Sequence, residues 1–264
     1  MMSDGPLERL RAIVARLRAP DGCPWDREQT HASLRTALVE ETYEVLAAIE
    51  ADDDVNLCEE LGDLLLHVVM HAQMASERGV FDFDAVARGI GEKMVRRHPH
   101  VFGEDRLADS AAVLVRWEEI KRQEKAKAGH APGEAEPSRM DGLPPSLPAL
   151  MRAQKLQEKA AKVGFDWPEI SGVQAKVHEE IAEIEAATPE TVGEEIGDLL
   201  FAAVNLARWH RLDAETALRH ATDKFARRFR HVEAALQARG QAWEAATFEE
   251  LDALWNEAKA AGQS

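Results

Sequence analysis

Apolar residues recur along this chain at helical spacing, and no stretch shows the sustained alternation of a β-strand. The first apolar face carries Leu7, Leu10, Ile13, Val14 and Leu17. Similar spacing predicts further helices over 38–49, 54–69 (capped by Asp54), 84–97, 110–128 and 148–162. Capping pairs predict three more helix starts, at Ser171–Gln174, at Thr188-Pro189 and at Thr247–Glu250. The pattern therefore predicts an all-α fold.

One stretch interrupts this pattern, because its residues cannot sit together in a helix. It contains Gly129, Pro132, Gly133, Pro137, Gly142, Pro144, Pro145 and Pro148. We interpret 129–147 as a linker between an N-terminal module, 1–128, and a C-terminal module, 148–264.

The two halves share four motifs in the same order, 139, 135, 131 and 138 residues apart. The pairs are Glu40–Glu44 with Glu179–Glu183, Glu59–Leu65 with Glu194–Leu200, Lys93–Arg97 with Lys224–Arg228, and Trp117/Lys121 with Trp255/Lys259. Such a repeat indicates an internal duplication, and hence two homologous helical modules in tandem.

Acidic residues dominate the charge: 48 Asp and Glu against 32 Lys and Arg give a net charge of −16. This field repels nucleic-acid backbones and anionic lipid, so we expect neither as a partner. A nucleotide substrate would require metal ions or local cations. Cys23 and Cys58 fit no zinc or redox motif, no signal sequence or membrane span is evident, and we expect a cytoplasmic protein.

Paired carboxylates give the clearest chemical signal. Glu41 and Glu44 share one helix face, and Glu60 and Asp63 share a face of the next helix. A lone pair of this kind is more often a solvated surface, but here two pairs stand on consecutive helices. The repeat supplies the same quartet as Glu180, Glu183, Glu195 and Asp198. Four converging carboxylates predict a hard divalent cation, Mg²⁺ first and Mn²⁺ as a substitute.

Cations accompany the acidic motifs. Lys224 and Arg228 lie four residues apart, as do Trp255 and Lys259. They fit contacts to phosphates and to a base or ribose, although such residues also occur as ordinary surface and core positions.

Histidines suggest a different metal chemistry in the first half only. His67 and His71 follow Asp63 at helical spacing, but Ala202 and Leu206 occupy the matching positions. A ligand role common to both modules is therefore excluded.

The acidic motifs also allow two rival interpretations. A di-iron carboxylate bundle needs repeated Glu-x-x-His pairs, whereas Glu28/His31 is the single example. The other rival is a helical interaction scaffold with a vestigial metal site, above all for the N-terminal module.

The segments Cys23–Asp26 and Gly164–Trp167 look like matching loops, facing either a nucleobase or the core.

Together these motifs resemble the MazG family of all-α nucleotide pyrophosphohydrolases, over nearly the whole chain. The two-module form is marked further by Gly22–Asp26, Arg96–Phe102 and Leu147–Lys155. The resemblance implies Mg²⁺-dependent hydrolysis of nucleoside triphosphates to monophosphate and pyrophosphate. It also implies a homodimer whose subunits share a four-helix core, with the C-terminal module as the main catalytic one.

The resemblance carries the metal-ligand role to both quartets and the catalytic role to the second, together with Glu179. It carries the nucleotide-contacting role to Lys224, Arg228, Trp255 and Lys259. We expect water to attack the α-phosphorus, with Glu179 or Glu40 as a candidate base or second-metal ligand. One departure is that Thr188–Gly193 holds no cation, where relatives can carry a lysine before the second acidic pair.

Overall fold

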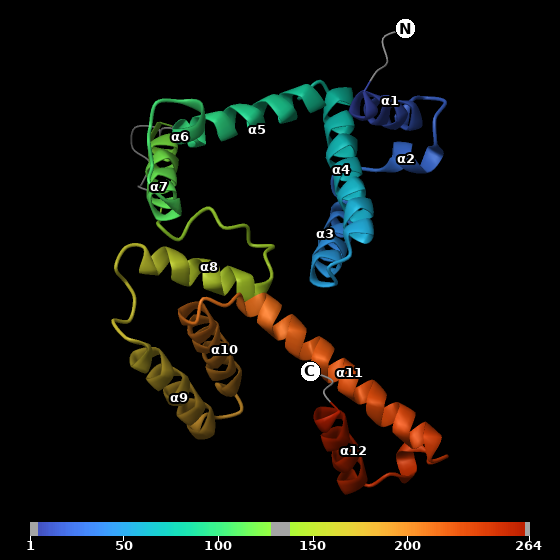
Figure 1. Ribbon diagram of the computed structural model, residues 1–264, viewed down its shortest axis with the longest axis vertical. Helices are drawn as coiled ribbons and strands as arrows, with labels where there is room; N and C mark the ends of the chain where they lie inside the picture. The colour runs from blue at the N-terminus through green and yellow to red at the C-terminus, as the bar shows by residue number, and fades with distance from the viewer. Residues whose placement is uncertain (1–4, 128–137, 262–264) are drawn as a thin grey trace. The chain divides into compact units, whose positions relative to one another are not determined.

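The computed structural model describes residues 5–127 and 138–261, which form twelve α-helices and one short 3-10 helix without any strand (Figure 1). This confirms the predicted all-α class. The chain divides into two compact units, Met1–Ala131 and Pro132–Ser264. Part of the predicted linker falls outside the described residues, and 138–148 consist of turns and irregular backbone. No described helix is long and apolar enough to cross a membrane.

The first unit is built around one long helix. Its elements are α1 (Pro6–Arg18), α2 (Pro24–Glu28), α3 (Arg35–Glu50), α4 (Asp54–Glu77), α5 (Phe83–Arg97), α6 (Pro99–Phe102) and α7 (Ser110–Lys127). Helix α4 packs against α1, α3 and α5, and α5 packs against α7. The predicted loop at Cys23–Asp26 is largely helical instead, because Pro24 begins α2 at a position where a missing N–H costs nothing.

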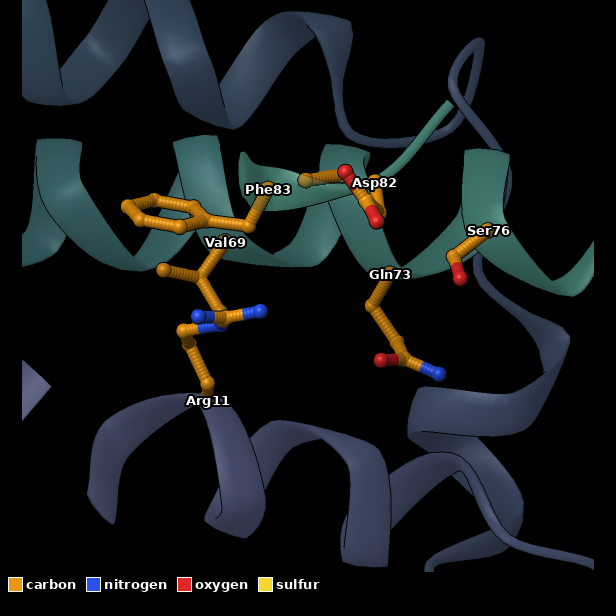
Figure 2. A pocket seen from close by; sticks show the side chains of 7 residues that line it. Arg11, Val69, Gln73, Ser76, Asp82 and Phe83 are labelled. Carbon is orange, nitrogen blue, oxygen red and sulfur yellow. The ribbon is translucent and has the colours of Figure 1, made fainter. Parts of the chain in front are cut away.

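The core of this unit lies where α1 meets α4. Its buried side chains are Val14, Leu34, Val69, Met70 and Met74, with Leu10 and Phe83 packed against them. Figure 2 shows a small pocket beside this core, lined by Arg11 of α1, Gln73 of α4, and Asp82 and Phe83 at the start of α5. Arg11 lies over the Phe83 ring and forms an ion pair with Asp84, and these two contacts hold α1 against α5.

Asp53, and not the predicted Asp54, caps the N-terminus of α4. The sequence predicted Asp54 as the cap, whereas the carboxylate of Asp53 accepts the backbone N–H groups of Val55 and Asn56. Asp53 therefore satisfies two of the donors that a helix start leaves unpaired.

The second unit contains α8 (Ala149–Ala161), α9 (Ile170–Ala186), α10 (Val192–Trp209), α11 (Ala214–Ala238), η1 (Trp243–Ala245) and α12 (Phe248–Ala260). Helices α8 and α9 pack on α10, and α12 packs on α11. Gln154 on α8 fastens the α10–α11 corner, since its side chain bonds the carbonyl of Leu212 and the N–H of Ala214. Val232, Leu236 and Leu254 form the buried contact between α11 and α12.

Two predicted helix starts in this unit are wrong and one is confirmed. Helix α9 begins at Ile170 without a side-chain cap, and the Ser171 hydroxyl turns back to Glu169. Pro189 lies in a turn before α10, where its fixed φ suits a turn position. The pair Thr247–Glu250 forms the complete capping box at α12.

Candidate metal centre

Each unit brings three glutamates together at one helical hairpin. In the first unit, Glu41 and Glu44 of α3 meet Glu60 of α4, and one carboxylate oxygen from each lies within 4.8 Å of the others. The hairpin achieves this because residues three apart share a helix face. The predicted convergence of α3 and α4 carboxylates therefore occurs for these three residues.

The second unit repeats the arrangement between α9 and α10. Glu180, Glu183 and Glu195 also bring carboxylate oxygens within 4.8 Å of one another. Glu180 is only 3% exposed, and its Oε2 atom is buried without a hydrogen-bond partner. A buried acceptor of this kind is costly unless something binds it. The unpaired oxygen fits a cation held by the three carboxylates.

The fourth member of each predicted quartet lies outside this close group. Asp63 and Asp198 stand one helical turn beyond Glu60 and Glu195. Asp63 is half-buried, and its charge contributes to raising the pKa values of Glu41 and Glu60. Asp198 is exposed. Their metal-ligand roles remain predictions.

Burial and the mutual repulsion of carboxylates both raise pKa values at the first centre. Burial is the largest cause that raises the pKa of Glu41, and the adjoining carboxylates of Glu44, Asp63 and Glu60 raise it further. The pKa of Glu60 is likewise raised by burial and then by Glu44, Asp63 and Glu59. This centre therefore carries more negative charge than its surroundings neutralise.

A lysine balances the second centre. The Lys176 ammonium lies 2.6 Å from Oε1 of Glu180 and 2.7 Å from Oε1 of Glu179. Hydrogen bonds to Glu179 and Glu180 raise the pKa of this lysine. Burial and then Glu180 raise the pKa of Glu183, while Lys176 opposes that rise. Lys176 was not among the predicted site residues, although it lies four residues before Glu180 and so shares its helix face. The matching position in the first unit is Ala37.

Helix position also distinguishes the two centres. Glu195 lies in the first turn of α10, whereas Glu60 is a full turn inside α4. The N-terminus of a helix carries a partial positive charge from unpaired N–H groups. The second centre therefore lies in a more positive local field, although Thr188–Gly193 itself holds no cation.

The predicted nucleotide-contacting residues gather on α11 and α12. The Arg228 guanidinium lies 5.9 Å from the centre of the Trp255 ring, which also packs against Phe225. Lys224 lies one turn before Arg228, and Lys259 lies one turn after Trp255 and bonds Asn256. This cation–aromatic cluster lies on α11 and α12, whereas the glutamates lie on α9 and α10.

The corresponding cluster of the first unit is partly neutralised. Arg97 is bound by Glu124 at 2.6 Å, and Lys121 by Glu118 at 2.5 Å. Lys121 also lies 5.2 Å from the Trp117 ring centre. Arg97 and Lys121 of this cluster therefore each have a carboxylate partner within the first unit.

The aromatic side chains of the two segments expected to face a nucleobase or the core are not buried in the core, and a nucleobase-facing role stays a prediction. Asp166 pairs with Arg208 at 2.6 Å and accepts the Trp209 indole N–H, so it anchors the segment to α10. Trp25, Phe165 and Trp167 are 63%, 82% and 44% exposed. The aromatics are therefore surface groups in this arrangement.

The family model for the MazG nucleotide pyrophosphohydrolase domain matches the chain twice, at residues 29–102 and 173–233. Each match contains one glutamate trio. The chain belongs to the MazG family. Its two matched segments follow the duplication detected in the sequence.

Relatives extend the likeness beyond those segments. The nucleoside triphosphate pyrophosphohydrolase of Escherichia coli strain K12 is 48% identical, covering 96% of this chain and 97% of the relative. A protein of Thermotoga maritima, named nucleoside triphosphate pyrophosphohydrolase/pyrophosphatase MazG, is 46% identical over 96% of this chain and 95% of its own. The uncharacterized protein YabN of Bacillus subtilis is 46% identical over 94% of this chain, which matches half of that longer protein.

Proposed function

We propose that this chain hydrolyses nucleoside triphosphates to nucleoside monophosphate and pyrophosphate at the α9–α10 centre, with Mg²⁺. The observation that carries the proposal is the buried, unpaired Oε2 of Glu180 within a trio of glutamates. The names of the two full-length relatives support the same reaction class.

The donor set favours a hard cation. Three carboxylates, with Asp198 as a fourth oxygen donor one turn away, suit Mg²⁺, and Mn²⁺ as its substitute. When bound, the metal would neutralise phosphate charge and lower the pKa of a coordinated water, which favours attack at the α-phosphorus. Glu180, Glu183 and Glu195 would hold it.

The protein's own residues supply the rest of the site. Lys176 lies beside the glutamates and can donate to a phosphate oxygen while it still holds Glu180. The first turn of α10 adds backbone N–H groups that favour an anion. Glu179 is held by Lys176, which positions it at the edge of the site as the candidate base.

We further propose that the second unit is the catalytic one. It has Lys176 where the first unit has Ala37, and its acidic trio lies at a helix N-terminus. The first centre retains its glutamates and would bind metal without a lysine at the position of Lys176.

A second copy of the chain would complete the core. Apolar side chains beside the α9–α10 glutamates remain 41–52% exposed: Ile181, Ile196, Leu200 and Phe201. The α3–α4 hairpin exposes Val39, Tyr43, Leu61 and Leu65 in the same way. Two hairpins packed face to face form a four-helix bundle that removes such surface from water. We therefore propose a homodimer.

Product identification tests the proposal. A panel of ribo- and deoxynucleoside triphosphates is incubated with and without Mg²⁺, and products are separated by chromatography. Glu180→Gln and its duplicated counterpart Glu41→Gln form a matched pair, as do Asp198→Asn and Asp63→Asn. We expect monophosphate and pyrophosphate, lost without metal and lost in the two second-unit variants only.

Other results have definite meanings. Diphosphate with orthophosphate would show that a different bond breaks. Loss of turnover only in Glu41→Gln and Asp63→Asn would move catalysis to the first unit. No turnover of any triphosphate by folded protein with Mg²⁺ would contradict the enzyme assignment and favour the scaffold.

A further inference from the structure

Three histidines of the first unit lie close together. Two of them belong to the half of α4 that follows Glu60, and the third comes from the turn before α3. His67 and His71 stand four residues apart on α4, so they share one face of that helix. His31 belongs to the turn that precedes α3, and its ring stacks on His71 with centroids 5.1 Å apart. Their Nδ1 atoms are 2.8 Å from each other. The fold thus brings together residues forty positions apart in the sequence.

His67 adds a buried nitrogen with nothing to bind. Its side chain is 8% exposed, and its Nδ1 has no hydrogen-bond partner among the described residues. The ring lies 6.3 Å from that of His71, centre to centre. A buried polar atom of this kind costs free energy until it is paired. The cluster therefore contains both a hydrogen-bonded nitrogen pair and an unpaired nitrogen.

The protonation state of the cluster suits metal binding. At 2.8 Å, one of the His31 and His71 Nδ1 atoms must offer a lone pair to the other. Neutral imidazole is the form that ligates metal ions. The acceptor of the His31–His71 pair and the unpaired Nδ1 of His67 are therefore candidate ligand atoms.

We propose that His31, His67 and His71 bind a transition-metal ion, Zn²⁺ first, that ties the turn before α3 to α4. Imidazole nitrogens suit Zn²⁺, Ni²⁺ or Cu²⁺, whereas the glutamate oxygens suit Mg²⁺. Among the described residues, only the two glutamate trios bring three ligand atoms within 4.8 Å. The nitrogens of the three histidines therefore do not all lie within this distance of one another, and ligation by all three requires side-chain rotation.

This site would belong to the first unit alone. The positions that correspond to the three histidines are Ile170, Ala202 and Leu206, none of which can ligate a metal. The turn leads directly into α3, which carries Glu41 and Glu44. A metal at the histidines would therefore fix the start of the helix that supports the first carboxylate centre, independently of whether that centre is catalytic.

Calorimetric titration of the full-length, chelator-stripped chain with ZnCl₂ tests the proposal, in excess Mg²⁺ so that the glutamates are occupied. We expect a zinc ion that Mg²⁺ does not displace. His71→Ala, His31→Ala and His67→Ala should each weaken it by at least about tenfold, because removing even a supporting group costs that much at metal sites. His210→Ala, an exposed histidine at the end of α10, is the matched control.

Two further readings make the result decisive. Zinc binding that is unchanged by the three histidine variants, or is lost in Glu60→Gln or Glu195→Gln instead, would overturn the proposal. Histidine-ring NMR of the unmodified chain provides evidence without any substitution. Zinc should shift the ring signals of His31, His67 and His71, and an unaltered spectrum would refute the site even if a variant failed to fold.

Discussion

Arg97 and Glu124 form a closely held ion pair in which the guanidinium donates to Oε2 at 2.6 Å. Arg96 donates to the other oxygen of the same carboxylate. Glu124 lies three residues beyond Lys121, and the residue three beyond Lys259 is Gly262, which has no carboxylate. The duplicated cation motif is therefore bound internally in the first unit by a residue that the second unit lacks.

This pair makes the stability of the first unit depend on pH. Arg97 and then Arg96 lower the pKa of Glu124 to about 2, from an ordinary value of 4.5. A lowered folded-state pKa stabilises the fold above 4.5, and that contribution is lost as the pH falls toward 2. Glu124→Gln should lower Tm at neutral pH, with the difference shrinking through this window. Circular dichroism melts at several pH values would measure it, and a difference independent of pH would contradict the assignment.

Lys176 should matter for turnover more than any other lysine on the α8–α10 helices. We expect Lys176→Ala to lower kcat/KM by about 100-fold, the usual cost of losing one charge-stabilising donor in an active site. Lys155→Ala is the control, because Lys155 also pairs with a glutamate on its own helix but belongs to α8. Steady-state kinetics with one triphosphate would decide. Equal activity in the two variants would remove Lys176 from the mechanism.

The raised pKa of Glu60 at the first centre should affect the stability of metal-free protein. The raised pKa of Glu60 means that the fold is favoured below about pH 4.5 and loses this advantage as the pH rises through the higher folded-state value. In chelator, Glu60→Gln should therefore match the wild type in acid and exceed its Tm at neutral pH.

Magnesium should reverse that order. A ligand at a hundredfold excess over its Kd stabilises a fold by about 2.7 kcal/mol, and Glu60→Gln should forfeit much of this gain in the first unit. Thermal melts with and without Mg²⁺ would measure both effects. A Glu60→Gln protein that is less stable than wild type in chelator would contradict the raised pKa of Glu60.

Substitution by alanine at two glycines of the first unit should change its stability in opposite directions. A Cβ at Gly22 would lie 2.2 Å from the carbonyl oxygen of Leu17, which is backbone and cannot easily yield. Gly22→Ala should therefore destabilise the unit by about 1–3 kcal/mol. A Cβ at Gly91, inside α5, would meet nothing, and Gly91→Ala should stabilise it by about 0.5–1 kcal/mol. Urea denaturation would compare them, and equal signs would contradict the local geometry.

Disruption of the proposed dimer is testable on α10. Leu200 is 52% exposed beside the second centre. Leu200→Glu should shift the sedimentation coefficient toward that of a monomer, because a charge cannot be buried unpaired between two hairpins. Phe248→Glu, at an even more exposed apolar residue on α12, is the control. Identical sedimentation of the Leu200 variant and wild type would exclude this face as the interface.

Local spacing explains which parts of the site the sequence could predict. Glu180 and Glu183 are three residues apart, so their common helix face follows from helical geometry. Lys176 has the same kind of local relationship to Glu180, but the comparison of the two halves concealed it because Ala37 breaks the repeat. A duplication identifies what the copies share and hides what one copy alone possesses.

Contacts between distant segments were beyond prediction. The approach of His31 to His71 depends on how a turn before α3 lies against α4, which no periodicity encodes. Two predictions of where a helix begins were wrong for a related reason. Pro189 suits both a first helical turn and a simple turn, and the hydrogen bonds around Thr188 and Thr191 decide for the latter.

Each carboxylate centre is assembled from a single helical hairpin, and this locality bears on how the molecule folds and evolves. The residues of the second centre, from Lys176 to Asp198, all lie within Ile170–Trp209. Contacts between neighbours in the chain form quickly, because little loop-closure entropy opposes them. Each hairpin can therefore organise its ligands before the rest of its unit is complete. A self-contained element of this kind can be copied whole, and one copy can then change its chemistry without the other losing its own.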